Sequence, residues 1–161
     1  MNHVKTLLTH RIVLMLLIYG CICSFALPVM ASKRFVDNSD GTVTDNKTGL
    51  MWVAKDNGVP IDWHGATEYC KNLRVGEYSD WRMPTLAELA SLFDRNRKNK
   101  NGYHTIELIS TTAQSCWAAE TRGATAGRFN FTYGKEYWLR KSYSGPTRVL
   151  AVRNLNSTLG G

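Results

Sequence analysis

The sequence predicts an α+β fold, with a hairpin, two helices and a series of strands following one another along the chain. Three observations support this. Turn residues separate short apolar runs before residue 55, and apolar residues recur at helical spacing between residues 62 and 93. Short runs rich in aromatic and β-branched residues then follow residue 114. Helices and strands in separate parts of a chain are typical of α+β proteins rather than of a parallel α/β sheet.

Residues 1–31 have the organisation of a secretory signal peptide. Two basic residues and no acidic one precede an apolar stretch, and the segment ends on a small-residue pattern at Ala31. This predicts cleavage between Ala31 and Ser32. Two alternatives stay open: the segment is retained as an anchor, or Cys21 is lipid-modified. We expect an exported protein, periplasmic or extracellular, with no stable membrane span after processing.

The rest of the chain is predicted to form one domain over residues 32–153, followed by a short polar tail over 154–161. Signal cleavage removes two of the 20 basic residues and none of the 13 acidic ones, which leaves a net charge of +5. This excess favours anionic partners. Export argues against a nucleic acid as the physiological partner, so we expect no nucleic-acid partner.

Two cysteines, Cys70 and Cys116, remain after signal cleavage. An even number in an exported protein predicts one disulfide, which would stabilise the fold by roughly 4 kcal/mol in the loop-entropy model. The alternative is a pair of buried free thiols.

The first element expected is a β-hairpin or meander. Asp40-Gly41 marks one turn, and residues 46–49 (Asn-Lys-Thr-Gly) mark the next. The carboxylates of Asp37, Asp40 and Asp45 also resemble part of a calcium loop. Their spacing fits no EF-hand, and Asp is common in turns because its side chain bonds the local backbone. We therefore expect turn chemistry here, with no calcium and no other metal or cofactor.

Residues 60–73 predict a first helix with Asp62 as its N-cap. Apolar residues at i, i+3, i+4 and i+7 define its inward face. These residues are Ala66, Tyr69, Cys70 and Leu73.

A second helix is predicted to begin after Thr85. Thr85 and Glu88 have the spacing of a capping box, in which each side chain accepts from the backbone N–H of the other residue. We expect this helix to end near Asp94. Its predicted buried stripe consists of Leu86, Leu89, Ala90 and Phe93.

The residues before this helix place a large aromatic side chain between opposite charges, in the run Asp80-Trp81-Arg82. We interpret Trp81 as a plug at one end of the core, where it buries on the order of 200 Å2. Asp80 and Arg82 would then hydrogen-bond backbone groups of an irregular loop. In the alternative interpretation, Arg82 binds an anion.

Short strands are predicted for the C-terminal third. Residues 128–133 alternate between polar and aromatic side chains, which is typical of a half-buried strand. We expect Phe129, Phe131 and Tyr133 to share its buried face.

The candidate binding site is the polar loop after the second helix. Residues 96–101 read NRKNKN, the pattern X-B-B-X-B-X in which B is basic. Basic side chains on an accessible loop attract a sulfated glycan, and arginine can contact sulfate through two N–H groups. The candidate ligand-binding residues are Arg95, Arg97, Lys98 and Lys100. Loops of this composition are also common as merely solvated surface.

Arg140 and Lys141 form a second, weaker basic pair, which we expect to extend the same patch. Tyr137 and Trp138 precede them and offer rings that could stack on a sugar.

Catalytic motifs are missing from the mature sequence. Its two histidines, His64 and His104, are not at metal-ligand spacing, and it contains no H-E-x-x-H, G-x-S-x-G or C-x-x-C. We expect no enzyme.

Several of these segments occur together in one known family. GTVTDNKTGLMW at 41–52 is followed by A-x-x-Y-C-x-x-L at 66–73, by DWRMPTLAELASL at 80–92, by a Trp-containing strand, and by R-V-x-x-V-R at 148–153. From Phe35 to Arg153 the chain resembles the Lcl C-terminal domain family.

The resemblance implies a C-type-lectin-like fold, similar to that of formylglycine-generating enzymes, with two helices packed on short twisted antiparallel sheets. A collagen-stalked adhesin of the family binds sulfated glycosaminoglycans and trimerises. The present chain has no G-X-Y stem and lacks the lectin calcium signatures E-P-N and W-N-D. The leading expectation is a non-enzymatic, adhesin-like domain that binds an anionic or sulfated extracellular polysaccharide. The alternative is an assembly module of the bacterial envelope whose partner is an envelope or surface protein.

Overall fold

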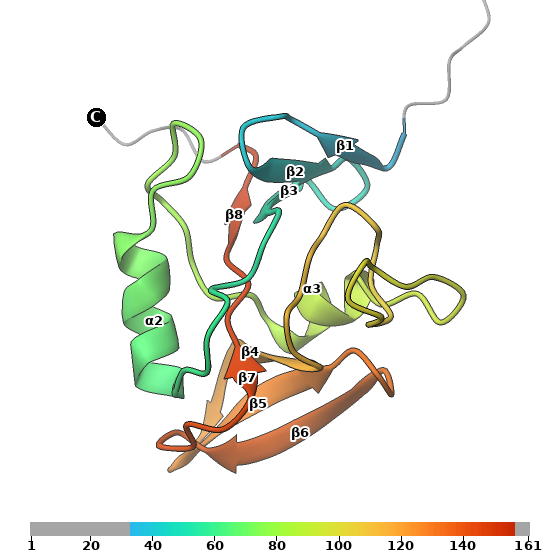
Figure 1. Ribbon diagram of the computed structural model, residues 1–161. Coiled ribbons are helices and arrows are strands. Elements are labelled where there is room, and N and C mark those ends of the chain that lie inside the picture. Colours follow the sequence, from blue (N-terminus) through green and yellow to red (C-terminus); the bar gives the residue numbers. More distant parts are fainter. Residues whose placement is uncertain (1–32, 157–161) are drawn as a thin grey trace, which may run out of the picture. The chain divides into compact units, whose positions relative to one another are not determined.

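The computed structural model describes residues 33–156, which form an α+β domain with two four-stranded sheets and two helices (Figure 1). One sheet has the strand order β1-β2-β3-β8 and the other the order β6-β5-β4-β7. The predicted α+β class is confirmed. The predicted signal peptide, its cleavage site and the last five residues lie outside the described residues.

The first sheet joins the two ends of the domain. It consists of β1 (Phe35–Asp37), β2 (Thr42–Asp45), β3 (Leu50–Val53) and β8 (Val152–Asn154), all paired antiparallel. The predicted turns connect the first three strands, and Gly41 and Gly49 adopt the positive φ values (88° and 68°) that favour glycine there.

Asp37 and Asp40 accept hydrogen bonds within the turn in which they lie. Asp40 accepts hydrogen bonds from the N–H and the hydroxyl of Thr42, at 2.9 and 2.6 Å, and Asp37 accepts from the N–H of Ser39 at 2.8 Å. Both carboxylates therefore stabilise the turn between β1 and β2.

The second sheet consists of β4 (Ser115–Arg122), β5 (Thr125–Asn130), β6 (Lys135–Arg140) and β7 (Thr147–Arg148). The first three strands form an antiparallel meander, but β7 pairs parallel with β4, so the sheet is not purely antiparallel. The expectation for Tyr133 is wrong. β5 ends at Asn130 and the chain turns, so Phe129 and Phe131 are buried whereas Tyr133 is 60% exposed.

The first helix, α2 (Trp63–Asn72), forms as predicted. Asp62 is its N-cap and accepts from the N–H of Gly65 at 2.7 Å. Ala66 and Cys70 are buried, and Tyr69 and Leu73 are partly buried on the same face.

The second helix, α3 (Leu86–Ser91), begins with the predicted capping box but ends before Asp94. The N–H groups of Leu92 and Phe93 bond to carbonyls three residues back, a tighter turn that closes the helix. Ala90 is exposed rather than buried because so short a helix presents only a narrow inner face, formed by Leu86 and Leu89.

α3 packs on β4 and β5. Gly127 of β5 makes this approach possible, because a Cβ atom there would lie 3.0 Å from Leu86 Cδ1. This close packing holds α3, and with it the start of the loop that follows, against the second sheet.

The predicted disulfide between Cys70 and Cys116 is not formed, and both residues are buried free thiols. Burial raises the pKa of the Cys70 thiol to about 12 and raises that of Cys116 well above its ordinary value, so both thiols are protonated at neutral pH. The prediction relied on compartment and an even cysteine count. Neither reports the distance between Cα atoms, which a disulfide restricts to less than about 7 Å.

Candidate functional site: a basic loop beside a cavity

The loop that follows α3 presents its cations to solvent. We call residues Arg95–Asn101 the basic loop. All four candidate ligands in it are exposed: Arg95, Arg97, Lys98 and Lys100.

A buried asparagine holds this loop in place. The Asn99 side-chain N–H groups donate to the carbonyl of Ile109 at 3.1 Å and to the hydroxyl of Thr111 at 3.0 Å. Its side-chain oxygen accepts from the backbone N–H groups of Asn101 and Tyr103. Asn99 is only 4% exposed, so the lysines on either side of it are left at the surface.

Asn99 was not among the site residues predicted from the sequence. The sequence Asn99-Lys100-Asn101-Gly102 contains a pattern that could have indicated it. An asparagine shortly before Asn-Gly is typical of a turn in which the side chain of the first asparagine hydrogen-bonds the backbone.

The charges of the basic loop are weakly neutralised by the protein itself. Arg97 Nε lies 3.4 Å from Asp94 Oδ2, and both side chains are well exposed. Such a surface pair contributes less than about 1 kcal/mol. Among the described residues, Arg95, Lys98 and Lys100 form no ion pair. All four cations can therefore meet an external anion at little cost.

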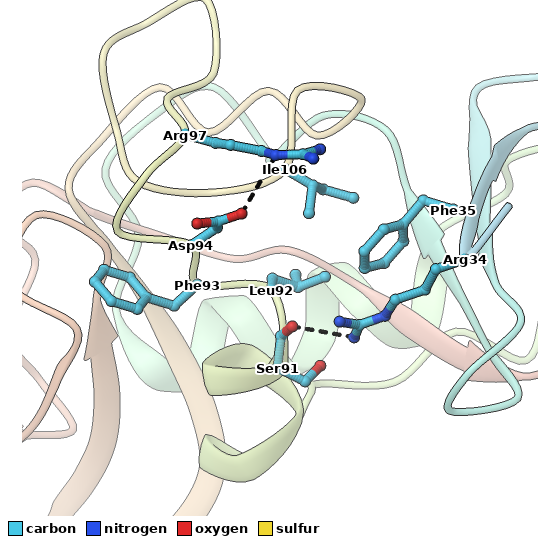
Figure 2. Close-up of a pocket in the computed structure, with 8 residues that line it drawn as sticks. All are labelled: Arg34, Phe35, Ser91, Leu92, Phe93, Asp94, Arg97 and Ile106. Carbon is cyan, nitrogen blue, oxygen red and sulfur yellow. Dashed lines mark hydrogen bonds and ion pairs between the residues drawn. The ribbon is translucent and has the colours of Figure 1, made fainter.

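A cavity of about 260 Å3 lies next to the loop. Figure 2 shows Arg97 on one side of it and Arg34 and Phe35 on the other, with Leu92 and Ile106 between them. Ligand pockets commonly measure about 300–1,000 Å3. This cavity therefore suits one small group of a larger ligand rather than a whole oligosaccharide.

The two arginines that line the cavity differ in how strongly they are bonded to other groups of the protein. Arg34 donates to both carboxylate oxygens of Asp45, at 3.0 and 2.8 Å, and to the Ser91 carbonyl at 3.1 Å. Burial alone would raise the pKa of Asp45, but hydrogen bonds from Arg34, Thr48 and Lys47 hold it below the ordinary value. Arg34 therefore joins β2 to the end of α3, and Arg97 is the cation available to a ligand.

The structure does not bring Arg140 and Lys141 to this loop. Arg140 pairs with Thr125 at the start of β5. The basic loop lies at the other end of that strand, where the N–H of His104 donates to the carbonyl of Phe131 at 3.0 Å. Six residues of strand, at about 3.3 Å each, separate the two positions by roughly 20 Å. The two basic groups are therefore separate patches, and the predicted single patch is corrected.

The aromatic residues before Arg140 are partly covered. The Arg122 guanidinium lies 3.7 Å from the centroid of the Trp138 ring, and Arg128 lies 5.6 Å from that of Tyr137. One face of the Trp138 ring is thus in contact with a cation of the protein.

The Asp80–Arg82 motif is built into the fold. Trp81 is 3% exposed, and its indole N–H donates to the carbonyl of Tyr78 at 3.1 Å. Asp80 accepts from Arg153 Nε at 2.6 Å, and Arg153 is 2% exposed. The motif therefore fastens the loop before α3 to β8.

Arg82 is committed to the capping box. Its two terminal nitrogens donate to the Glu88 carboxylate at 2.8 and 2.7 Å, and one of them also reaches Asn154. Burial would raise the pKa of Glu88, but the hydrogen bonds from Arg82 and Thr85 lower it below its ordinary value. These contacts favour the structural interpretation of Arg82 over an anion-binding one.

A second cavity of about 260 Å3 lies between α2 and this motif, and its lining is mainly apolar. Arg82 is held by Glu88 at 2.7 Å, and Lys71, which forms an exposed pair with Glu68, is the other cation among the described residues that line it. A mainly apolar cavity with one exposed lysine suits an anionic ligand less well than the four cations of the basic loop do.

The described residues contain neither a group of three or more His, Cys, Asp or Glu that could hold a metal ion nor a helix long and apolar enough to cross a membrane.

The domain is therefore a small α+β module with an exposed basic loop beside a cavity. Residues 41–153 match the family model of the Lcl C-terminal domain, and the chain belongs to this family. The predicted family is confirmed. A search of curated proteins finds no match.

Proposed function

We propose that this is an exported, non-enzymatic binding domain of C-type-lectin-like fold that holds an anionic, sulfated polysaccharide at the basic loop. The observation that carries the proposal is the set of four exposed cations on a loop whose backbone is fixed by a buried asparagine. A fixed backbone lowers the entropy cost of presenting charges to a ligand.

The cavity beside the loop supports the same assignment. A sulfate or carboxylate group at Arg97 would lie at its edge, and part of the sugar would lie against the partly exposed Phe35. A planar guanidinium offers two N–H groups to such an anion. No cofactor takes part in this proposal.

Salt-dependent retention on an immobilised sulfated glycosaminoglycan tests the proposal. Replacing Arg97, Lys98 and Lys100 by Ala should lower the salt concentration at which the protein elutes, because three of four charges are removed. The melting temperature should stay the same, since exposed side chains contribute within about 0.5 kcal/mol to folding.

A matched control separates the loop from net charge. The double variants Arg97→Ala/Lys98→Ala and Lys71→Ala/Arg74→Ala each remove two exposed positive charges, and α2 lies away from the basic loop (Figure 1). The first variant should elute at clearly lower salt than the second. Equal elution of both variants, or wild-type elution of the triple variant, would contradict the assignment.

Retention on a polyanion alone does not distinguish a glycan from nucleic acid, because both reward positive charge. An array of sulfated and unsulfated polysaccharides, with single-stranded DNA as competitor, supplies the distinction. A blank array together with recovery of one envelope protein from native extracts would favour the assembly-module alternative.

A further inference from the structure

β6 is an open edge of the second sheet. It is the first strand in the order β6-β5-β4-β7, and Figure 1 shows no described element beyond it. All six of its residues are exposed or partly exposed. An open edge presents backbone N–H and C=O groups to any strand that can pair with it.

The hydrogen bonding of β6 to β5 determines which backbone groups face outward. The N–H of Lys141 donates to the carbonyl of Ala124 at 2.9 Å, so these residues form a hydrogen-bonded pair. In an antiparallel ladder such pairs alternate with pairs that make no hydrogen bonds. The N–H and C=O groups of Glu136, Trp138 and Arg140 therefore point away from β5.

One outward group is already used. The carbonyl of Arg140 accepts from the N–H of Tyr143 at 2.9 Å. The N–H of Arg140 and both backbone groups of Glu136 and Trp138 remain at the edge, without a backbone hydrogen bond among the described residues.

The side chains along this edge are self-complementary about Trp138. When β6 pairs antiparallel with β6 of a second copy and Trp138 faces Trp138, Glu136 faces Arg140 of that copy, and the reverse pair forms by symmetry. Tyr137 faces Leu139 in the same way, so apolar side chains meet apolar ones. Both charged residues are exposed and form no ion pair among the described residues.

Other registers are worse. A shift of one residue would set outward-facing backbone groups against inward-facing ones, which cannot form a ladder. A shift of two residues would set Glu136 against Trp138 or Ser142 and lose both ion pairs. The one like-charge contact in the favoured register joins Lys135 to Lys141, just beyond the strand, where the Lys141 ammonium lies 4.9 Å from the centroid of the Trp63 ring.

We propose that the protein forms a two-fold symmetric dimer through antiparallel pairing of its β6 strands about Trp138. The Trp138 pair exchanges two backbone hydrogen bonds, and each Arg140 N–H donates to the Glu136 carbonyl of the other copy. The result is a continuous eight-stranded sheet in which the β6 edges are closed. A single strand pair buries a small interface, so the dimer is reversible and concentration-dependent. This inference is independent of the proposed glycan binding.

Sedimentation equilibrium of the protein as the cell processes it, over a range of concentrations, tests the dimer. Either single reversal, Glu136→Arg or Arg140→Glu, places like charges opposite each other twice and should lower the association constant at least about tenfold. The double variant that carries both reversals should restore dimerisation, because the pairs then form with opposite polarity. Melting temperature measured below the dimerisation range checks that each variant is folded.

A cysteine placed at the two-fold axis tests the register. Opposite Cα atoms of a hydrogen-bonded pair are about 5.5 Å apart, within disulfide range, so Trp138→Cys should give a covalent dimer on mild oxidation. Tyr137→Cys should cross-link far more slowly, because position 137 faces position 139 of the other copy. A monomer at all concentrations, a different oligomer, a dimer insensitive to single reversals, or equal cross-linking of both variants would overturn the proposal.

Discussion

The segment Asp80–Glu88 and the basic loop Arg95–Asn101 are both charged, and they are close in sequence, but they use their charges in opposite ways. In the first segment Arg82 meets Glu88 at 2.7 Å and Asp80 meets Arg153 at 2.6 Å, so each charge is satisfied within the domain. In the second, the cations are exposed, and among the described residues only Arg97 forms an ion pair, at 3.4 Å. A charged motif whose partners lie in its own domain stabilises the fold, and one whose anchor is a neutral buried residue can serve a ligand.

The largest expected effect belongs to Trp81. Trp81→Ala should lower the free energy of unfolding by about 3–5 kcal/mol, because a fully packed aromatic side chain leaves a cavity. Retention of the remaining folded protein on the glycan column should not change. Near wild-type stability of the variant in urea unfolding would contradict the structural role of Trp81. A changed elution salt would contradict the separation of the two segments into a structural one and a binding one.

Asn99→Ala should have the next largest effect, on both properties. Removing the side chain leaves the buried Ile109 carbonyl and Thr111 hydroxyl, and the partly buried N–H of Tyr103, without this partner, which costs about 1–3 kcal/mol. The elution salt should also fall, because Lys98 and Lys100 lose their fixed backbone. Asn96→Ala is the control: this residue is exposed in the same loop, and its variant should match the wild type in both measurements. Equal behaviour of the two variants would remove the anchoring role.

Glu88→Gln should have a smaller effect that depends on pH. The folded pKa of Glu88 lies below its ordinary value of 4.5, so the ionised form stabilises the fold above about pH 4.5, and this contribution disappears as the pH falls through the folded pKa. The variant should be about 1 kcal/mol less stable at pH 7. The difference from the wild type should shrink in acid.

Thermal unfolding between pH 2.5 and 7 measures this effect. Glu68→Gln is the control, because Glu68 forms an exposed pair with Lys71, and this variant should show little change in stability at any pH. A difference between Glu88→Gln and the wild type that is constant over this range would show that the carboxylate charge is not what stabilises the helix start.

The smallest expected effect is that of a reductant. Because Cys70 and Cys116 are free thiols in the structure, the melting temperature should be the same with and without reductant. Thiol titration should find no reactive group in the folded protein and two in the processed protein unfolded without reductant. A count of zero in the unfolded protein would show that the two cysteines are bonded.

Local patterns predicted most of the secondary structure. The turns at Gly41 and Gly49, the Asp62 N-cap and the Thr85–Glu88 capping box depend on residues close in sequence, and all of them form. Element ends were less predictable. α3 stops at Ser91 because a tighter turn follows it, and β5 stops at Asn130 because the Asn130 side chain accepts from the N–H groups of Thr132 and Tyr133 and closes a turn.

The fold class, the helix caps and the position of the basic loop could be predicted from the chain alone, because they follow from short-range backbone chemistry and composition, and the family could be recognised from its motifs. Which charges remain available to a ligand depends instead on the packing of the elements. This packing pairs Arg82 with Glu88, places Arg140 at the far end of β5, and anchors the loop through Asn99. It also keeps Cys70 and Cys116 unbonded. Distances between residues far apart in the chain depend on how the elements pack, and no local pattern contains them.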